Sequence, residues 1–297
     1  MRITFSQAFE DGLRDIARVG EQLSDAQRRV SSGRRINAPS DDPAGTAAAI
    51  GEHAGLATVD SYVRATDAAS SRLAVVDAAL SDIVNLLTAA KVTATAARGS
   101  GRSVTQLSAL STEILGLRDG LMGDINTRFG GTYLFGGASA TTAPYATVAG
   151  SISGYQGDSV TQSIDVSDGR AVQVSFDGGE IFQGTDSQHV LDLLTDLATA
   201  ISAGDSAGIQ TGLDGLDRAF DRALFAQTRV GIAQRMLDDT RPQLDSTRLG
   251  SLARVSATED ANMAEAISDL TRAKTAQESA LASFATLGQL SLLDYLR

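Results

Sequence analysis

The side chains that most often carry catalysis or bind metals are scarce in this chain. Its 297 residues include no cysteine and two histidines, His53 and His189. Thiol chemistry, disulfides and histidine-rich metal sites are therefore nearly excluded. Neither histidine has an acidic or nucleophilic residue at a recognised catalytic spacing, so each is expected to be a surface or helix-end residue. We predict no catalytic residue, no bound metal and no cofactor.

Two other segments share only part of the pattern of a ligand-binding loop. The glycine-rich run 99–103 lacks the lysine and the spacing of a phosphate-binding loop, and no strand precedes it. It is predicted to be a turn between helices. The acidic run that begins at Asp165 has Phe176 at the position where a calcium loop needs a glutamate. This second run is predicted to be a hairpin turn.

The densest group of charged and turn-forming residues is the segment 31–45, called here the connector. Gly33 is expected to end one helix and Asp42 to cap the next, with Pro43 at the first helical position, where no amide donor is needed. A second interpretation is that charged side chains of the connector meet complementary charges of neighbouring copies and set the register of an assembly. Those side chains are Arg34, Arg35, Asp41 and Asp42.

The excess of acidic over basic residues argues against a nucleic-acid partner. The chain carries 25 Lys and Arg against 36 Asp and Glu, a formal net charge of -11. A protein that binds a phosphate backbone needs a clustered positive surface, so we expect no nucleic-acid partner. Residues 1–10 lack the apolar core and cleavage site of a secretory signal, and no run of about 18 apolar residues occurs. We expect no Sec-type signal peptide and no membrane insertion.

Both ends of the chain carry a heptad-like apolar row, and we call these rows the terminal seams. Apolar residues recur every three or four positions, the spacing that keeps one helical stripe facing a neighbour. A helix of about 28 residues is about 42 Å long, which is longer than a small domain is wide. The N-terminal seam includes Phe5, Phe9, Ile16 and Leu23, and the C-terminal seam includes Ile267, Leu281, Phe284, Leu287 and Leu290.

Two uses of the terminal seams follow from their periodicity. The surplus length favours contact with other subunits. The alternative is that the two seams pair with each other inside one chain. Periodicity does not separate these uses, because both need an apolar stripe with the same spacing.

Further helical patterns lie between the seams. Apolar and small residues recur every three or four positions from Leu56 to Ala97, and this spacing predicts a long helix. Ser103 and Gln106 have the spacing of a capping box for a second helix. The pair at 130–131, two glycines, is expected to end that helix. These two helices are predicted to form an antiparallel hairpin.

The period changes between residues 132 and 188, where Gly, Ser, Thr and Asp are dense and apolar residues alternate. The Asp168-Gly169 pair between two alternating runs predicts a β-hairpin, because it accepts the positive φ of a tight turn. A second turn is expected at 177–179. About 55 residues bury little core of their own, so this insertion is expected to be a small satellite.

Helical periodicity returns at Val190, breaks at Gly204 and then resumes. Pro242 is expected to kink or end the resumed helix near Arg241, because proline removes an amide donor and crowds the preceding turn. The run 256–259 has capping-box spacing and is expected to start the last helix.

The predicted fold is mainly α, with long coiled-coil helices from both termini that form a rod and a small β-rich insertion. The predicted parts are the N-terminal helix with its connector at 1–42, a helix hairpin at 43–131, the insertion at 132–188, returning helices at 189–250 and the C-terminal helix at 251–297.

Several motifs of the chain are those of one family. Ser-Gly-Arg-Arg-Ile-Asn at 32–37, followed by Ser-Asp-Asp-Pro-Ala-Gly at 40–45, closely resembles the N-terminal signature of the flagellin superfamily. The opening residues 1–4 and the prolines of the connector are most similar to its hook-associated members. The runs 132–137, 260–270 and 290–296 also look like family motifs. The resemblance covers about residues 1–137 and 190–297 and leaves the insertion unmatched.

The resemblance implies an architecture and a set of partners. The two termini would pack as a coiled coil in the axial core of the flagellum, the helices at 43–131 and 189–250 would form the surrounding rod domain, and the insertion would project outward. Implied partners are copies of the chain in a ring, hook-associated protein 1, flagellin and a cytosolic flagellar export chaperone on the C-terminal helix. The implied route is type III export without signal cleavage, to the outside of the cell.

We therefore expect a structural subunit of the bacterial flagellum, not an enzyme, that joins hook to filament through helix packing. Its proposed assembly interface consists of the terminal seams and the four charged connector residues. One alternative is a flagellin that forms the filament itself. A second alternative is a cytosolic helical adapter that keeps its seams folded within one chain.

Overall fold

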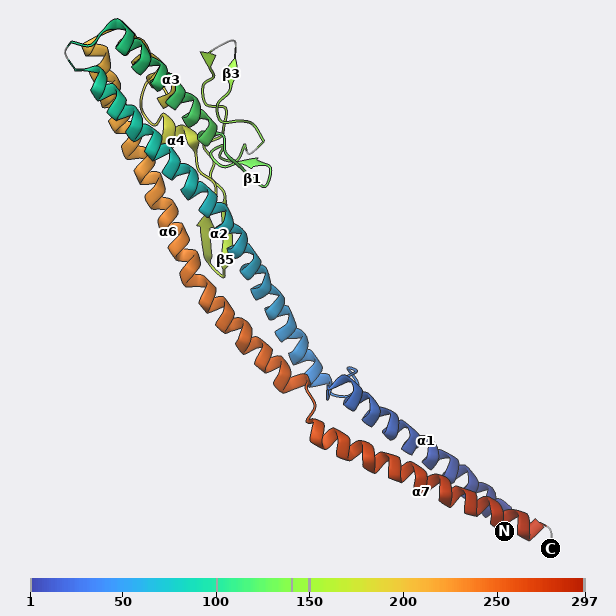
Figure 1. The fold of residues 1–297 in the computed structure, drawn as a ribbon. Helices are drawn as coiled ribbons and strands as arrows, with labels where there is room; N and C mark the ends of the chain where they lie inside the picture. The colour runs from blue at the N-terminus through green and yellow to red at the C-terminus, as the bar shows by residue number, and fades with distance from the viewer. Residues whose placement is uncertain (1, 100, 140, 149–150, 296–297) are drawn as a thin grey trace. The chain divides into compact units, whose positions relative to one another are not determined.

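The computed structural model describes residues 2–99, 101–139, 141–148 and 151–295. For residues 2–6, 8 and 287–295 the description covers the helical backbone and not the side chains. Over this part of the chain the fold is mainly α-helical with short antiparallel strand pairs, as the sequence predicts (Figure 1). The contacts divide it into two compact units, Met1–Thr58 with Thr247–Arg297, and Val59–Ser246. We call these the terminal unit and the central unit.

In the terminal unit, helices α1 (Arg2–Ser32) and α7 (Met263–Tyr295) lie side by side along their length (Figure 1). The first residues of α1 and the last residues of α7 come together at the same end of this pair. The terminal seams therefore pair with each other within one chain, the second of the two uses that periodicity allows.

The start of α2 (Pro43–Ala97) confirms the predicted helix boundary at the connector. Gly33 follows the last residue of α1 with a φ of 70°, a conformation that side chains with a Cβ adopt poorly. The amide of Gly45 donates to the Asp42 carboxylate at 2.8 Å. Asp42 is thus the cap of α2 and Pro43 its first residue.

Two expected helix boundaries near the C-terminus, an end near Arg241 and a start at 256–259, are wrong, whereas a kink at Pro242 stays a prediction. Helix α6 (Ser206–Glu259) continues through Pro242 and does not end near Arg241, because the contacts of a 54-residue helix outweigh the cost of one lost amide donor. The run 256–259 forms the last turn of α6 instead of capping α7. The cap of α7 is Asn262, whose side-chain oxygen accepts a hydrogen bond from the amide of Ala264 at 3.2 Å.

The central unit is built on four helices. Part of α2 and part of α6 lie with α3 (Val104–Ile125) and α5 (Val190–Ala203) around one apolar core. Both halves of the predicted capping box at Ser103 and Gln106 are present, at 2.9 and 3.3 Å. The predicted break at Gly204 is also confirmed, with φ at 68°. The large, fully buried helix residues of this core include Leu73, Leu80, Ile83, Leu87, Ile114, Leu121 and Ile125.

Three antiparallel strand pairs occur in the described part of the insertion and its margin. They are β1 (Arg128–Phe129) with β2 (Thr132–Tyr133), β3 (Thr147–Val148) with β4 (Ser151–Ile152), and β5 (Ser163–Ser167) with β6 (Arg170–Gln173). The hairpin predicted at Asp168-Gly169 joins β5 and β6, with Gly169 at a φ of 69°.

The turn glycines act differently from the prediction in two places. Helix α3 ends at Ile125, and the glycines at 130–131, both with positive φ, form the turn between β1 and β2. The segment 177–179 starts the short helix α4 (Gly178–Phe182) instead of forming a second hairpin turn. The carboxylate of Asp177 accepts from the amide of Gly179 at 2.7 Å and so caps that helix.

The insertion has no apolar core separate from that of the helices, so it is less of a satellite than expected. Its buried side chains, among them Phe135, Tyr145 and Phe176, belong to the same apolar cluster as the helices of the central unit. Arg72 of α2 fastens two parts of it, since its guanidinium donates to the Val174 carbonyl at 2.7 Å and to the Thr132 hydroxyl at 3.0 Å. The insertion therefore folds on the helices, which supply the burial that 55 residues lack.

Helix α2 is the exception to the expected lack of membrane-length apolar segments. By length and composition alone it could cross a membrane, with a mean hydropathy of 1.6 in its most apolar window. That window is 39% buried inside the protein. The buried part of α2, which includes Leu73, Leu80 and Ile83, belongs to the core of the helical fold.

Candidate assembly surface

The fully buried part of the contact between α1 and α7 consists of small side chains. Among the side chains that the structure describes, the buried apolar residues of the terminal unit are Ala26, Ile36, Ala49 and Ala266. A groove of about 310 Å³ follows the two helices and is lined by residues of both. Alanine lets two helices approach closely but removes little apolar area from water. The pairing therefore leaves several of the larger seam side chains exposed.

One aromatic contact lies near the free end of the helix pair. The rings of Phe9 and Phe284 have centroids 4.8 Å apart and are tilted by 40°. A Cβ at Gly12 would come within 2.9 Å of the Phe284 ring, so glycine is needed for this close approach. Farther along, Arg29 and Asp269 form a loose ion pair at 3.9 Å.

Large apolar side chains of both helices remain exposed to solvent. Phe9 and Leu13 of α1 are 41% and 48% exposed, and Ile267 and Leu281 of α7 are 52% and 50% exposed. With Met263, which is also exposed, we call these the exposed seam residues. A pair of helices buries one stripe of each, so a wider apolar surface needs further helices to cover it.

The other predicted seam residues are placed as follows. Ile16, Leu23 and Phe284 are half-buried. Phe5, Leu287 and Leu290 lie on the helical backbone of α1 and α7, and their side chains lie outside the described residues. Their role in assembly stays a prediction.

The acidic residues of the connector have partners within the chain. The Asp41 carboxylate accepts hydrogen bonds from the amides of Asn37 and Ala38, both at 2.9 Å. These amides hold the pKa of Asp41 below its ordinary value. The pKa of Asp42 is lowered in the same way by the amide of Gly45 and then by the Arg35 guanidinium, 3.1 Å away. The capping role predicted for Asp42 is confirmed.

The two connector arginines also point to groups of their own chain. Arg35 binds Asp42 and the Thr258 carbonyl, the latter at 2.8 Å. Arg34 lies 3.4 Å from the carboxylate of Glu259 at the end of α6. Contact of these charges with neighbouring copies is not tested by the structure and stays a prediction.

Glu259 and its second partner His53 are site residues that the sequence did not reveal. His53 Nε2 lies 2.8 Å from Glu259 Oε1, across 206 positions of sequence. No local pattern joins residues so far apart. The second histidine, His189, is a helix-end residue as expected, because it caps α5, but it is buried and not on the surface.

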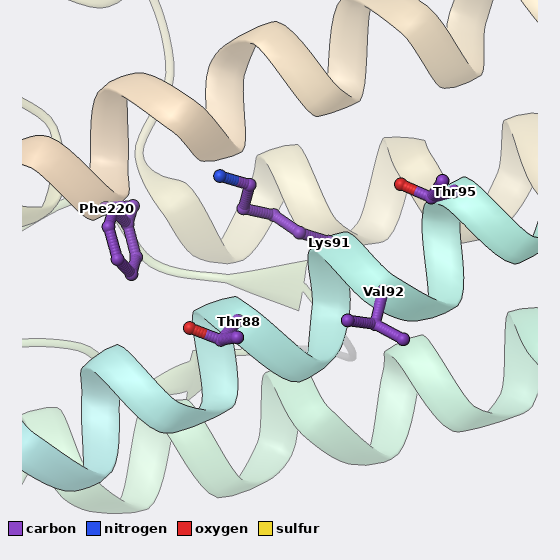
Figure 2. A pocket seen from close by; sticks show the side chains of 5 residues that line it. All are labelled: Thr88, Lys91, Val92, Thr95 and Phe220. Carbon is purple, nitrogen blue, oxygen red and sulfur yellow. The ribbon is translucent and has the colours of Figure 1, made fainter.

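A second groove, of about 400 Å³, lies in the central unit between α2 and α6. Figure 2 shows its lining, with Lys91 of α2 extending toward Phe220 of α6 (Figure 2). The ammonium of Lys91 lies 5.0 Å from the centre of that ring and pairs with Asp217. This arrangement joins α2 to α6 and places no acid, base and nucleophile together. Within the described residues no group of three or more His, Cys, Asp or Glu side chains could hold a metal ion.

The chain matches known proteins along its whole length. The model of a family described as the bacterial flagellin N-terminal helical region matches residues 10–140. Flagellar hook-associated protein 3 of Escherichia coli strain K12 is 24% identical over 317 residues, which cover 99% of each chain. Flagellar hook-associated protein 3 of Salmonella typhimurium is 25% identical over 320 residues, again 99% of each.

A solved structure shares the fold. The flagellar junction protein FlgL from Legionella pneumophila superposes with a TM-score of 0.59 at 15% identity, over 72% of this chain and 100% of that one. These matches confirm the resemblance that the connector motifs predict.

Proposed function

We propose that this flagellin-like chain is a structural subunit of the bacterial flagellum that joins the hook to the filament. The exposed seam residues carry the proposal, because the pair of helices leaves these large apolar side chains to be covered by other helices. The full-length match to two hook-associated proteins supports the junction role over that of a filament flagellin.

The mechanism is helix packing. Neighbouring copies in a ring bring further helix pairs against the exposed seam residues. The assembly then buries the apolar area that a single pair of helices leaves in water. A junction subunit meets a different protein on each side. We propose hook-associated protein 1 on the hook side and flagellin on the filament side, with a cytosolic export chaperone holding α7 before assembly.

The predicted parts take separate roles in this proposal. Residues 1–42 and 251–297 form the axial core, residues 43–131 and 189–250 the rod, and 132–188 the outward insertion. The pairing of α1 with α7 supports the first assignment. We further propose that the chain is not an enzyme, needs no cofactor and works outside the cell, because its conspicuous surface is apolar and its charged connector residues are engaged in caps.

Immunolabelling of isolated flagella tests the location. A single band at the hook end is expected for a junction subunit. Continuous labelling along the filament would instead identify a flagellin, and recovery of the protein in the cytosol alone would identify an adapter.

A single substitution tests the surface. Ile267→Asp places a charge on an exposed seam residue of α7, so we expect cells to lose filaments under shear while the purified protein keeps its melting temperature. Ser268→Asp is the matched control, since it adds the same charge at the next exposed position of the helix. Equal filament retention by the two variants would contradict an assembly role for this surface.

A further inference from the structure

Two breaks between helices, far apart in sequence, lie against each other in the terminal unit. One is the connector between α1 and α2, and the other is the segment 260–262 between α6 and α7. The amide of Arg35 donates to the Glu259 carbonyl at 2.7 Å, and the amide of Ala261 donates to the Gly33 carbonyl at 2.8 Å. Arg34 and Asp260 form an antiparallel bridge between the breaks. The two breaks thus share a short piece of sheet-like pairing.

Glu259 contributes a side chain as well as a carbonyl to this pairing. Its residue is 8% exposed, and its two carboxylate oxygens face different elements. Oε1 lies 2.8 Å from His53 of α2, and Oε2 lies 3.4 Å from the Arg34 guanidinium in the connector. A buried carboxylate that loses such partners is strongly unfavourable, because water does not replace them.

The other charged groups around this carboxylate are already paired. Arg35 is paired with Asp42, and Arg254 of α6 with Glu52 of α2 at 2.8 Å. The carboxylate of Asp260 accepts from the Ser256 hydroxyl. None of these groups is free to replace Arg34, so separation of the breaks would remove the guanidinium that pairs with Glu259.

We propose that Glu259 is a latch that makes the two breaks open and close as one hinge. Its backbone carbonyl and its carboxylate bind the same connector, so α1 cannot swing at its break without disturbing the break before α7. Opening of either break alone would separate the Glu259 carboxylate from Arg34 and lose both amide-to-carbonyl hydrogen bonds between the breaks. The pair of α1 and α7 therefore changes its orientation as a unit, and this coupling needs no partner protein.

Hydrogen exchange at the amides of Arg35 and Ala261 tests the latch on the purified full-length chain. In Glu259→Gln we expect both amides to exchange faster by about the same factor, on the order of tenfold, because both report the same opening. Glu52→Gln is the matched control. It breaks the ion pair with Arg254, which also joins α2 to α6, but it touches neither break, so exchange at both amides should stay within about twofold of the unsubstituted chain.

Glu259→Gln could unfold the whole terminal unit, and this would appear as faster exchange throughout α1 and α7. A second, milder variant tests the latch in that event. His53→Ala removes only the half-exposed arm of the latch. We expect a smaller acceleration, still by a common factor at Arg35 and Ala261. Unchanged exchange in both variants, or acceleration of one amide without the other, would overturn the proposal.

Discussion

At the scale of single residues, the contacts that hold the elements together come from polar side chains that are largely buried and have partners. Arg72 anchors the insertion, Glu259 joins the two breaks and His189 caps α5. Each satisfies a backbone or charged group that would otherwise lie in the interior without a hydrogen bond. Such residues are few, and each can be tested by one substitution.

Arg72→Met should loosen the insertion. The variant keeps the apolar stem but leaves the Val174 carbonyl without its donor, so we expect a loss of about 1.5–3 kcal/mol in the unfolding free energy. Burial already lowers the pKa of Arg72, which reflects its withdrawal from water. Urea unfolding measures the loss. Arg241→Met, which breaks the exposed pair with Asp67, is the control and should cost less than about 1 kcal/mol.

The buried cap His189 should make the central unit sensitive to acid. Burial lowers the pKa of His189, although Asp192 opposes the shift. The unfolded chain then binds this proton more tightly than the folded chain. The contribution of the neutral ring to stability is complete above about pH 6.5 and is lost as the pH falls below that value.

Unfolding free energies measured from pH 8 to pH 5 check this prediction. In the unsubstituted chain the amide of Asp192 lies 3.3 Å from a ring nitrogen of His189. His189→Asn keeps a side-chain cap for this amide but does not titrate in this pH range. The variant should lose less stability on acidification than the unsubstituted chain. Parallel pH curves for the two proteins would contradict the assignment.

At the scale of elements, the helices differ in what they bury. Those of the central unit contribute Leu, Ile and Val to a continuous core, whereas the fully buried apolar residues among the described side chains of α1 and α7 are Ala26 and Ala266. The first kind of contact is stable within one chain, because each large side chain removes more apolar area from water. The second kind positions two helices closely and leaves their larger apolar residues free for other helices.

Helix α6 contains an avoidable defect at Pro242. Proline leaves the carbonyl four residues earlier without its helical donor, so Pro242→Ala should stabilise the chain by about 1–3 kcal/mol. A higher melting temperature in calorimetry is the expected result. Ala223→Gly, at a buried position of the same helix, should shift it in the opposite direction. An unchanged melt for Pro242→Ala would mean that the helix has fully accommodated the ring.

At the scale of the whole molecule, the two units have very different interiors. The apolar cluster lies in the central unit, while the terminal unit has four buried apolar residues among its described side chains. Local stability follows the burial of apolar contacts. The purified monomer should therefore open its terminal helices more readily than its centre, and assembly should reverse this by covering the exposed seam residues.

Limited proteolysis at low protein concentration checks this difference. Early cuts should fall in α1 and α7 and leave a resistant core of about residues 59–246, identified by mass spectrometry. Assembled flagella should protect the same helices. Early cleavage within the central unit, with intact termini, would contradict the expected order.

The local elements of this protein are determined by the sequence itself. The capping box at Ser103 and Gln106, the cap at Asp42 and the hairpin at Asp168-Gly169 each depend on residues a few positions apart, whose geometry is set by the backbone. The same holds for the connector motifs that place the chain near the flagellins. Where two local signals compete, as at 256–259 and Asn262, spacing alone does not choose between them.

Only the tertiary structure decided which surfaces meet. The seams have the same spacing whether they pair within one chain or between chains. The burial of Ala26 and Ala266, beside an exposed Ile267, shows which face of each helix lies in the contact within the chain. The insertion shares the helical core because neither part buries enough apolar area alone. Glu259 meets His53 across 206 positions. Such contacts depend on the free energy of the whole fold, which cannot be read from a pattern of a few neighbouring residues.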